Sequence, residues 1–402
     1  MRRRETLGLL AAALLLLAGC TGRQAAVATP EPLPAGAVPF VYDRHLYFDA
    51  LVCDTIPARL VFDTGATGLY LDSLWLANSG YKPRQMVSGV MRGGAGTDIT
   101  HMRIILESLP LRIDSMRLQS GEVVPEIDLK GILGRRADGI FGQQFFDSLC
   151  VEFNLRKGHL RAVKADTLQT AGFTRCEVEK EEYRIFVPVR VNPEKGLAVE
   201  GRFLLDMGYP GTVTVGSSVA RRAGLERFSG KKAPYSSVSA GIGGRGRSWL
   251  CRADSVAVGG YTLAAVPVEV SENEAGLLAD RDFAGLIGNG LLERFDVVID
   301  FASPALYLRP AAGFRSPFPY ETGGIKLIDR TDICEGWIVT GLYEGIAPEG
   351  LQPGDVVVTW DGTRLKGHAS ADSLLRLRGR HAFTAVRGGA AAEYEIEVEE
   401  IL

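Results

Sequence analysis

The sequence predicts a mostly β protein built from two similar halves and a third, C-terminal domain. Short runs of β-branched and aromatic residues, separated by glycines, are typical of strands joined by turns. Two apolar runs end in an acidic loop and then resume, at Phe62-Asp63-Thr64-Gly65-Ala66 and at Leu205-Asp206-Met207-Gly208. An apolar segment ending in glycine follows each loop, 79 residues from Asp63 to Gly142 and 82 residues from Asp206 to Gly288. The common order and spacing indicate an internal duplication.

The first half, residues 40–165, is expected to contain strands on both sides of the Asp63 loop. Strands are expected at 45–53, 102–106, 111–118 and 151–154. Between them lies a glycine-rich hairpin tip with Gly93, Gly94 and Gly96. This tip is a candidate flap that closes over a bound ligand and excludes water, and a plain hairpin turn is the alternative.

The second half, residues 166–312, repeats this order around the Asp206 loop. Strands are expected at 185–191, 255–258, 266–270 and 297–301, with a glycine-rich tip at 241–246. Because the tip continues as a strand and follows no βαβ pattern, its GxGxxG spacing does not indicate a dinucleotide site.

The N-terminus has the features of an export signal. A positive Arg2-Arg3-Arg4 segment precedes an apolar run over 7–17 that is short for a membrane span. The run ends in Leu17-Ala18-Gly19-Cys20, which resembles the lipobox of bacterial lipoproteins and implies a signal peptide over 1–19 with lipid attached to Cys20. An ordinary secretory signal is the alternative. Residues 20–39, rich in Ala, Pro, Thr and Gly, are expected to form a flexible tether. The expected location is the bacterial cell envelope, on the membrane through the lipid anchor.

Composition and charge exclude several function classes. The 402 residues are 46% hydrophobic and 23% charged, with a net charge of −3. Because no basic cluster coincides with aromatic residues, nucleic acid is not an expected partner. The five histidines have no metal-binding spacing, so neither a metal nor another cofactor is expected. Five dispersed cysteines remain besides Cys20, most of them expected to be buried and unpaired, although an exported protein permits disulfides.

The Asp63 loop carries a specific family resemblance. Asp63-Thr64-Gly65-Ala66 after an apolar strand, with Ile140-Phe141-Gly142 closing the half, resembles the aspartic protease signature. Over residues 40–310 the pattern resembles bacterial retropepsin-like proteases in which two halves are fused in one chain, as in pepsin. The resemblance implies a bilobal pepsin/retropepsin-like fold, catalytic Asp63 and Asp206, and peptide or protein substrates.

Such chemistry needs two carboxylates in contact. Like charges at that distance cannot both ionise, so the pair shares a proton and supplies a general base and a general acid. Gly65 and Gly208 would let the two loops approach closely. In the family, a threonine of each loop hydrogen-bonds the opposite loop. Thr64 fits this role, whereas the thioether of Met207 cannot donate a hydrogen bond.

Two further consequences follow from these loops. Ala66 has no hydroxyl to donate to an ionised carboxylate, which predicts an activity optimum shifted from strongly acidic towards neutral pH. The Asp-Met-Gly loop leaves two alternatives to a single-chain protease. One is an inactive peptide-binding protein on a degenerate protease fold, and the other is a homodimeric enzyme that uses Asp63 from two chains.

The C-terminal region, residues 320–402, resembles a bacterial PDZ domain. The resemblance rests on the run Gly345-Ile-Ala-Pro-Glu-Gly-Leu-Gln-Pro-Gly-Asp-Val-Val357 and on the turn Trp360-Asp-Gly362. It implies binding of an extended peptide beside a strand and a helix. The candidate binding strand carries Gly336, Trp337, Ile338 and Val339, and packing of Trp337 inside the domain's own core is the alternative. A helix is expected at 369–380 and a last strand at 394–398.

Overall fold

The computed structural model describes residues 32–92, 99–238, 245–318, 321–366, 374–375 and 377–402. The chain divides into two units, residues 1–35 and 36–402, and the described strands and helices belong to the second. The predicted signal peptide, Cys20 and the flap residues Gly93, Gly94 and Gly96 lie outside the described residues. Within those residues, no helix combines the length and the apolar character that crossing a membrane requires.

The first half is mostly β, and strand β1 (Ala37–Pro39) precedes it in the sequence. The predicted tether over 20–39 is therefore too long, because its last residues pair with the first half. The strands of this half are β2 (Val41–Asp43), β3 (His45–Val52), β4 (Ile56–Asp63), β5 (Leu69–Asp72), β6 (Met86–Arg92), β7 (Ile99–Ile105), β8 (Pro110–Ile113), β9 (Met116–Gln119), β10 (Val124–Ile127), β11 (Gly139–Gly142), β12 (Cys150–Asn154) and β13 (His159–Val163). Its α-helices are α1 (Ser73–Asn78) and α2 (Lys130–Leu133).

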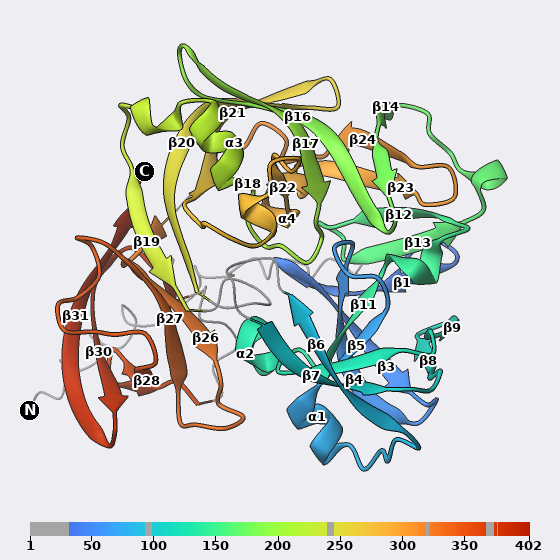
Figure 1. Ribbon diagram of the computed structural model, residues 1–402, viewed down its shortest axis with the longest axis horizontal. Coiled ribbons are helices and arrows are strands. Elements are labelled where there is room, and N and C mark those ends of the chain that lie inside the picture. Colours follow the sequence, from blue (N-terminus) through green and yellow to red (C-terminus); the bar gives the residue numbers. More distant parts are fainter. Residues whose placement is uncertain (1–31, 93–98, 239–244, 319–320, 367–373, 376) are drawn as a thin grey trace, which may run out of the picture. The chain divides into compact units, whose positions relative to one another are not determined.

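The second half repeats this plan with longer strands (Figure 1). Its strands are β14 (Thr174–Glu177), β15 (Glu179–Glu181), β16 (Arg184–Glu194), β17 (Leu197–Leu205), β18 (Val213–Val215), β19 (Ala233–Ser237), β20 (Gly246–Val258), β21 (Tyr261–Ser271), β22 (Gly285–Ile287), β23 (Phe295–Asp300) and β24 (Ala305–Pro310). Its α-helices are α3 (Ser217–Arg222) and α4 (Asn289–Leu292). The strands expected at 185–191, 255–258 and 266–270 are parts of β16, β20 and β21.

A six-stranded sheet joins the two halves. Its order is β1-β13-β12-β23-β24-β14, so three strands from the first half lie beside three strands from the second half in one hydrogen-bonded layer. The junction is the antiparallel pair β12–β23, in which Cys150 lies opposite Asp300 and Phe153 opposite Val297. The inward residues of both strands are buried, so the halves share one apolar core instead of meeting through a linker.

The third domain is also built of strands, and it continues the sheet of the second half. Its strands are β25 (Glu321–Thr322), β26 (Ile325–Asp329), β27 (Trp337–Tyr343), β28 (Val356–Trp360), β29 (Thr363–Arg364), β30 (Gly379–Arg387) and β31 (Ala390–Glu400). Antiparallel pairing of β19 with β27 places Tyr235 opposite Tyr343. The helix expected at 369–380 lies mostly outside the described residues, and its predicted end is wrong, because β30 begins at Gly379.

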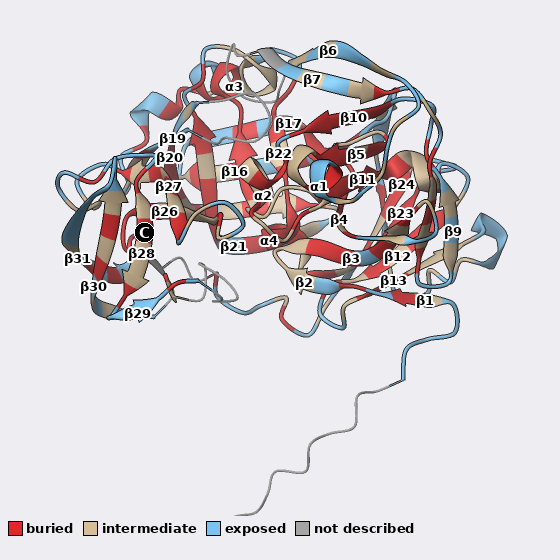
Figure 2. Ribbon diagram, turned by 90° about the horizontal axis from the view of Figure 1, so that it is seen from below, coloured by how far each residue is buried: buried red, intermediate tan, exposed pale blue. Residues whose placement is uncertain are grey.

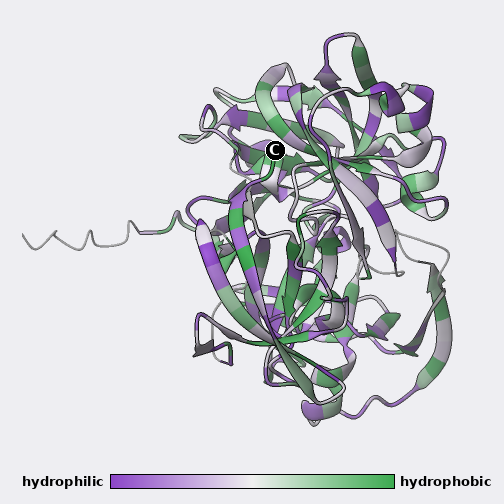
Figure 3. Ribbon diagram, turned by 90° about the vertical axis from the view of Figure 1, so that its left-hand side faces the viewer, coloured by the Kyte–Doolittle hydropathy of each residue, from purple (hydrophilic) through white to green (hydrophobic). Residues whose placement is uncertain are grey.

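The core follows the alternation of the long strands. In β16, buried residues alternate with exposed ones over most of the strand, as expected for a sheet with one face packed. Figure 2 shows the buried residues concentrated along central strands such as β4, β11 and β23, and Figure 3 shows the hydropathy changing along each strand. The third domain has its own apolar cluster, which includes Trp337, Val357 and Phe383. A separate core is what a domain needs to fold as a unit.

Candidate active site

Asp63 is the last residue of β4 and is held there by β11. Strand β11 runs parallel to β4, with Gly142 opposite Asp63, and antiparallel to β5 on its other edge. β11 therefore fills the gap between the two strands that flank the acidic loop. Within the loop, the Ala66 N–H donates to Asp63 O at 3.3 Å. The pairing with β11 and this hydrogen bond fix the turn between β4 and β5, and the Asp63 carboxylate lies at the tip of that turn.

Asp206 has the same surroundings in the second half. β22 runs parallel to β17 and antiparallel to β18, as β11 does with β4 and β5. The Asp206 N–H donates to Ile287 O at 3.0 Å, and the Tyr209 N–H donates to Asp206 O at 3.2 Å. The equivalence of Asp63 with Asp206, which the sequence repeat predicted, therefore extends to their backbone contacts.

The two carboxyl groups lie together, partly exposed to solvent. Each accepts a hydrogen bond from its own loop, from Gly65 N at 2.6 Å to Asp63 Oδ1 and from Gly208 N at 2.9 Å to Asp206 Oδ1. The two side chains also hydrogen-bond each other. A β-carbon on Gly208 would lie 2.6 Å from Asp63 Oδ2, too close for any side chain. The glycine is needed because the opposite carboxyl group occupies that space.

Desolvation in this position raises the pKa of both carboxyl groups above the ordinary 3.8. For Asp63, hydrogen bonds from Gly65 and from the Asp206 carboxyl group oppose the increase. For Asp206, the negative charge of Asp63 adds to desolvation and raises the pKa much further. Over the pH range between the two apparent pKa values of the pair, the two carboxyl groups share one proton.

Thr64 joins the two loops. Its buried hydroxyl donates to Leu205 O at 2.6 Å and accepts from Met207 N at 2.9 Å. This is the cross-loop contact that the family resemblance implied for Thr64. It holds the backbones next to Asp63 and Asp206 at a fixed separation, because a hydroxyl with one donor and one acceptor partner has little freedom to turn.

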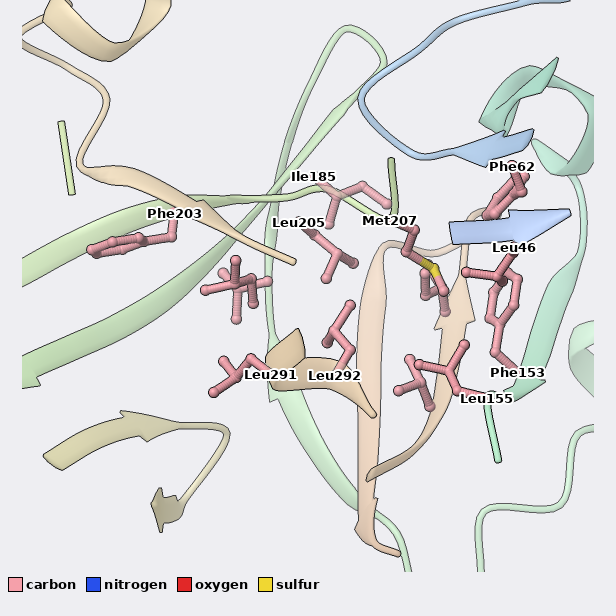
Figure 4. Close-up of a cluster of buried hydrophobic side chains, with 14 of the residues drawn as sticks. Leu46, Phe62, Phe153, Leu155, Ile185, Phe203, Leu205, Met207, Leu291 and Leu292 are labelled. Atoms are coloured by element: carbon pink, nitrogen blue, oxygen red, sulfur yellow. The ribbon is translucent and has the colours of Figure 1, made fainter. Parts of the chain in front are cut away.

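Met207 makes no equivalent contact with its side chain, which is fully buried. Figure 4 shows the thioether among Leu46, Leu155 and Leu292, within the apolar core of both halves. Met207 therefore supports the loop by packing, whereas Thr64 supports it by hydrogen bonding. The flexible Met side chain suits such an irregular site.

Two buried amides support the loops from behind, and the sequence analysis missed both. Gln143 Nε2 donates to Thr64 O at 3.2 Å, and Asn289 Nδ2 donates to Met207 O at 2.7 Å. Both residues are fully buried and directly follow the glycines that close the halves, Gly142 and Gly288. Superimposing the two repeats would have aligned these amides, so the signal was present in the sequence.

The strand predicted to bind peptide in the third domain is not available for it. At Trp337 and Ile338, β27 pairs with β26 on one edge and with β28 on the other. Trp337 and Val339 are fully buried, and a β-carbon on Gly336 would overlap Val357 O. The prediction for these four residues is therefore wrong, since they form the interior of the sheet. Among the described strands, β26 pairs only with β27, and at its other edge Asp329 O accepts a hydrogen bond from Arg135 N of the first half.

A comparison with known families identifies part of this site. A model of the aspartyl protease family matches residues 187–291, from β16 to α4. This segment, which contains Asp206, is similar to an aspartyl protease domain, and the similarity supports a peptidase that acts on peptides or proteins. No curated protein matches the chain. The match lies on the half whose Asp-Met-Gly loop departs further from the expected motif.

Other features of the described residues lie apart from the Asp pair. A cavity of about 1120 Å³ is lined by residues of the first half such as Arg59, Arg112 and Asp138, together with Asp332 of the third domain. It contains neither Asp63 nor Asp206. No cluster of three or more His, Cys, Asp or Glu side chains suited to a metal ion occurs in the described part of the chain. The five cysteines described there are free thiols.

Proposed function

We propose that this protein is an aspartic-type endopeptidase in which Asp63 and Asp206 activate water for peptide-bond hydrolysis. The observation that supports this most is the hydrogen-bonded pair of carboxyl groups, one on each of two equivalent loops. Between the pKa values of the pair, one group is a base and the other an acid, as non-covalent hydrolysis requires. The family match to the Asp206 half supports the same chemistry.

In this mechanism the ionised Asp63 takes a proton from a water molecule held between the two groups. The water oxygen attacks the carbonyl carbon of the substrate, and Asp206 donates its proton to the carbonyl oxygen. The resulting tetrahedral diol collapses when the proton on Asp63 passes to the leaving amine. Asp206 regains its proton from a diol hydroxyl, which restores the starting state. No covalent intermediate and no metal are needed for this sequence.

The test is digestion of an unfolded protein by the purified chain that begins at residue 36. Asp63→Asn and Asp206→Asn should each lower kcat/KM by at least about 10³-fold, since removing a group that exchanges protons in the transition state has effects of this size. Asp138→Asn is a useful comparison, because Asp138 is a partly exposed carboxylate on the same half that pairs with Lys130 and lies outside the Asp pair. Cleavage that survives both substitutions in the pair would refute the proposal.

The two alternatives give different results in the same test. An inactive binding protein cleaves nothing, yet should retain affinity for peptides. A homodimeric enzyme using Asp63 twice would be unaffected by Asp206→Asn and would lose activity on dilution. The hydrogen bonds of Thr64 to Leu205 and Met207 favour the single-chain arrangement, because they join the two loops within one chain.

We also propose that the third domain binds extended peptide segments as a PDZ domain does, and that Cys20 carries a lipid anchor at the cell envelope. Peptide affinity should be measured with the Asp63→Asn variant, so that cleavage does not consume the ligand.

The lipid anchor has its own test. Cys20→Ser should move the full-length chain from the membrane fraction to the soluble fraction of cells. Retention in the membrane fraction would refute the anchor.

A further inference from the structure

Strand β26 of the third domain contacts both halves of the protein. Lys326, near its start, lies against the second half, and Asp329, at its end, binds the first half. In Figure 1, β26 lies between β27 and α2. A single five-residue strand therefore connects two halves whose relative position decides whether Asp63 and Asp206 meet.

On the side of the second half, a row of side chains leads from Lys326 to the Asp206 loop. Lys326 Nζ lies 3.5 Å from the centroid of the Tyr235 ring. The Tyr235 hydroxyl faces the carboxylate of Glu269, which accepts a hydrogen bond from the Tyr209 hydroxyl at 3.4 Å. Tyr209 is three residues after Asp206, and its N–H bonds the Asp206 carbonyl. A change at Lys326 can thus reach the loop through three contacts.

On the side of the first half, Asp329 makes an ion pair and a backbone hydrogen bond with the same residue, Arg135. Arg135 Nε donates to Asp329 Oδ2 at 2.7 Å, and Arg135 N donates to Asp329 O at 2.8 Å. The backbone bond and the side-chain bond together fix the segment between α2 and β11, which contains Arg135, against the end of β26. Arg135 is four residues before β11, the strand that pairs with β4 and ends beside Asp63. The Asp329 contact therefore lies four residues before the strand that ends beside Asp63, and the Lys326 contact reaches Tyr209 of the Asp206 loop through Tyr235 and Glu269.

We propose that β26 is a positioning element of the active site: Lys326 and Asp329 fix the second and first halves to one strand and so hold the Asp206 and Asp63 loops in register. The proposal rests on the proposed function, because it assigns β26 a part in the same reaction. It makes the third domain necessary for catalysis and not only for recruitment of peptides. Neither Lys326 nor Asp329 is a catalytic residue, since each acts through other side chains.

The charge of Lys326 gives this contact a pH dependence. The groups that face it are Glu269 on β21, Tyr235 on β19 and Tyr343 on β27. Desolvation among them lowers the pKa of Lys326 to about 8, although the carboxylate of Glu269 opposes the change. When the ammonium group loses its proton above this pH, its attraction to the Tyr235 ring and to Glu269 disappears. Activity should then decline on the alkaline side.

The experiment compares Lys326→Met, Lys326→Arg and Asp329→Asn with the unchanged protein. Lys326→Met keeps the apolar stem and removes the charge, so kcat should fall about 10- to 100-fold while KM changes less than about threefold. Lys326→Arg should restore most of kcat and shift the alkaline decline to higher pH. Lys366→Met is the matched control, because Lys366 pairs with Glu335 at 2.7 Å within the third domain. It should behave like the unchanged protein.

Hydrogen exchange at the amides of Asp206 and Tyr209 provides a readout that does not depend on activity. Lys326→Met and Asp329→Asn should accelerate this exchange, and Lys366→Met should not. If the protein hydrolyses nothing, the proposed function fails, but the exchange data still decide whether β26 orders the loop. Unchanged exchange and unchanged kcat in both Lys326→Met and Asp329→Asn would overturn the inference. Tyr235→Phe, which keeps the ring but removes the hydroxyl that faces Glu269, provides a second variant should Lys326→Met fold poorly.

Discussion

Ala66 gives a direct test of how the loop sets the pKa of Asp63. In Ala66→Ser, the new hydroxyl would donate to the ionised carboxylate, and a hydrogen bond to a charged group is worth about 1.5–3 kcal/mol. Because one pKa unit is about 1.4 kcal/mol, the acid limb of kcat/KM should move to lower pH by about one unit. In the unchanged protein that limb should lie above 3.8, since desolvation raises the pKa of Asp63. A limb that stays in place or moves up would contradict this assignment.

Gly208 should tolerate no side chain. A methyl group there would push against the Asp63 carboxyl group, and displacements of about 1 Å in an active site can cost about 100-fold in rate. Gly208→Ala should therefore lower kcat at least about 100-fold with little loss of solubility. The control is Gly121→Ala, because a β-carbon on Gly121 would make an ordinary contact, 3.7 Å from Gln144 Nε2. Equal activity of the two variants would show that the loops are less closely packed.

The same carboxyl pair should lower stability at neutral pH. A raised pKa means that the folded state holds its proton more tightly than the unfolded chain does. The contribution of this pair to the free energy of unfolding should therefore be highest below pH 3.8 and decrease as pH rises through the folded pKa values. Asp206→Asn removes this cost, so its melting temperature should exceed that of the unchanged protein at pH 7, with a smaller difference at pH 4. A variant that melts lower at pH 7 would contradict the direction of the pKa shift.

At the scale of the loop-bearing strands, Thr64 and Met207 hold equivalent positions by different means. Thr64→Val leaves Met207 N and Leu205 O buried without their partner, which should cost about 2–4 kcal/mol in the free energy of unfolding. Thr64→Ser should recover most of it. Met207→Leu keeps the apolar volume and should cost less than about 1.5 kcal/mol. Chemical denaturation measures all three, and a large loss for Met207→Leu would show that the sulfur itself matters.

The local pattern predicted most strands but not where they turn. Residues 111–118 read as one strand, whereas the chain reverses between β8 and β9 with Asp114 at a φ of +49°. The alternation of apolar residues continues across this turn, so the pattern did not reveal it. Asp is one of the residues that tolerate this conformation, and Asp114-Ser115 was the available signal. The acidic loops were easier to predict, because both an abrupt end of an apolar run and a repeat marked them.

Pairings between distant segments decide the arrangement of the whole molecule, and no local pattern predicts them. The pairs β12–β23 and β19–β27 each join strands more than 100 residues apart. The error over Trp337 has the same origin. Its strand was recognised from its composition, but its neighbours on both edges come from other parts of the third domain. Which strand keeps a free edge is a property of the sheet and is not encoded in any one strand.

The continuous sheet predicts that the two halves are not self-sufficient. A chain that ends at Phe318 would lack β27, so the edge of β19 would lose its hydrogen-bond partner. Tyr235 and Leu250 would also lose the cover of Tyr343 and Ile401. An uncovered edge strand beside exposed apolar side chains is a template for association. The shortened chain should therefore form dimers or larger species in sedimentation, at concentrations where residues 36–402 remain monomeric. If it stays monomeric and melts at the same temperature, the third domain contributes nothing to the fold of the halves, and the sheet junction is only a contact.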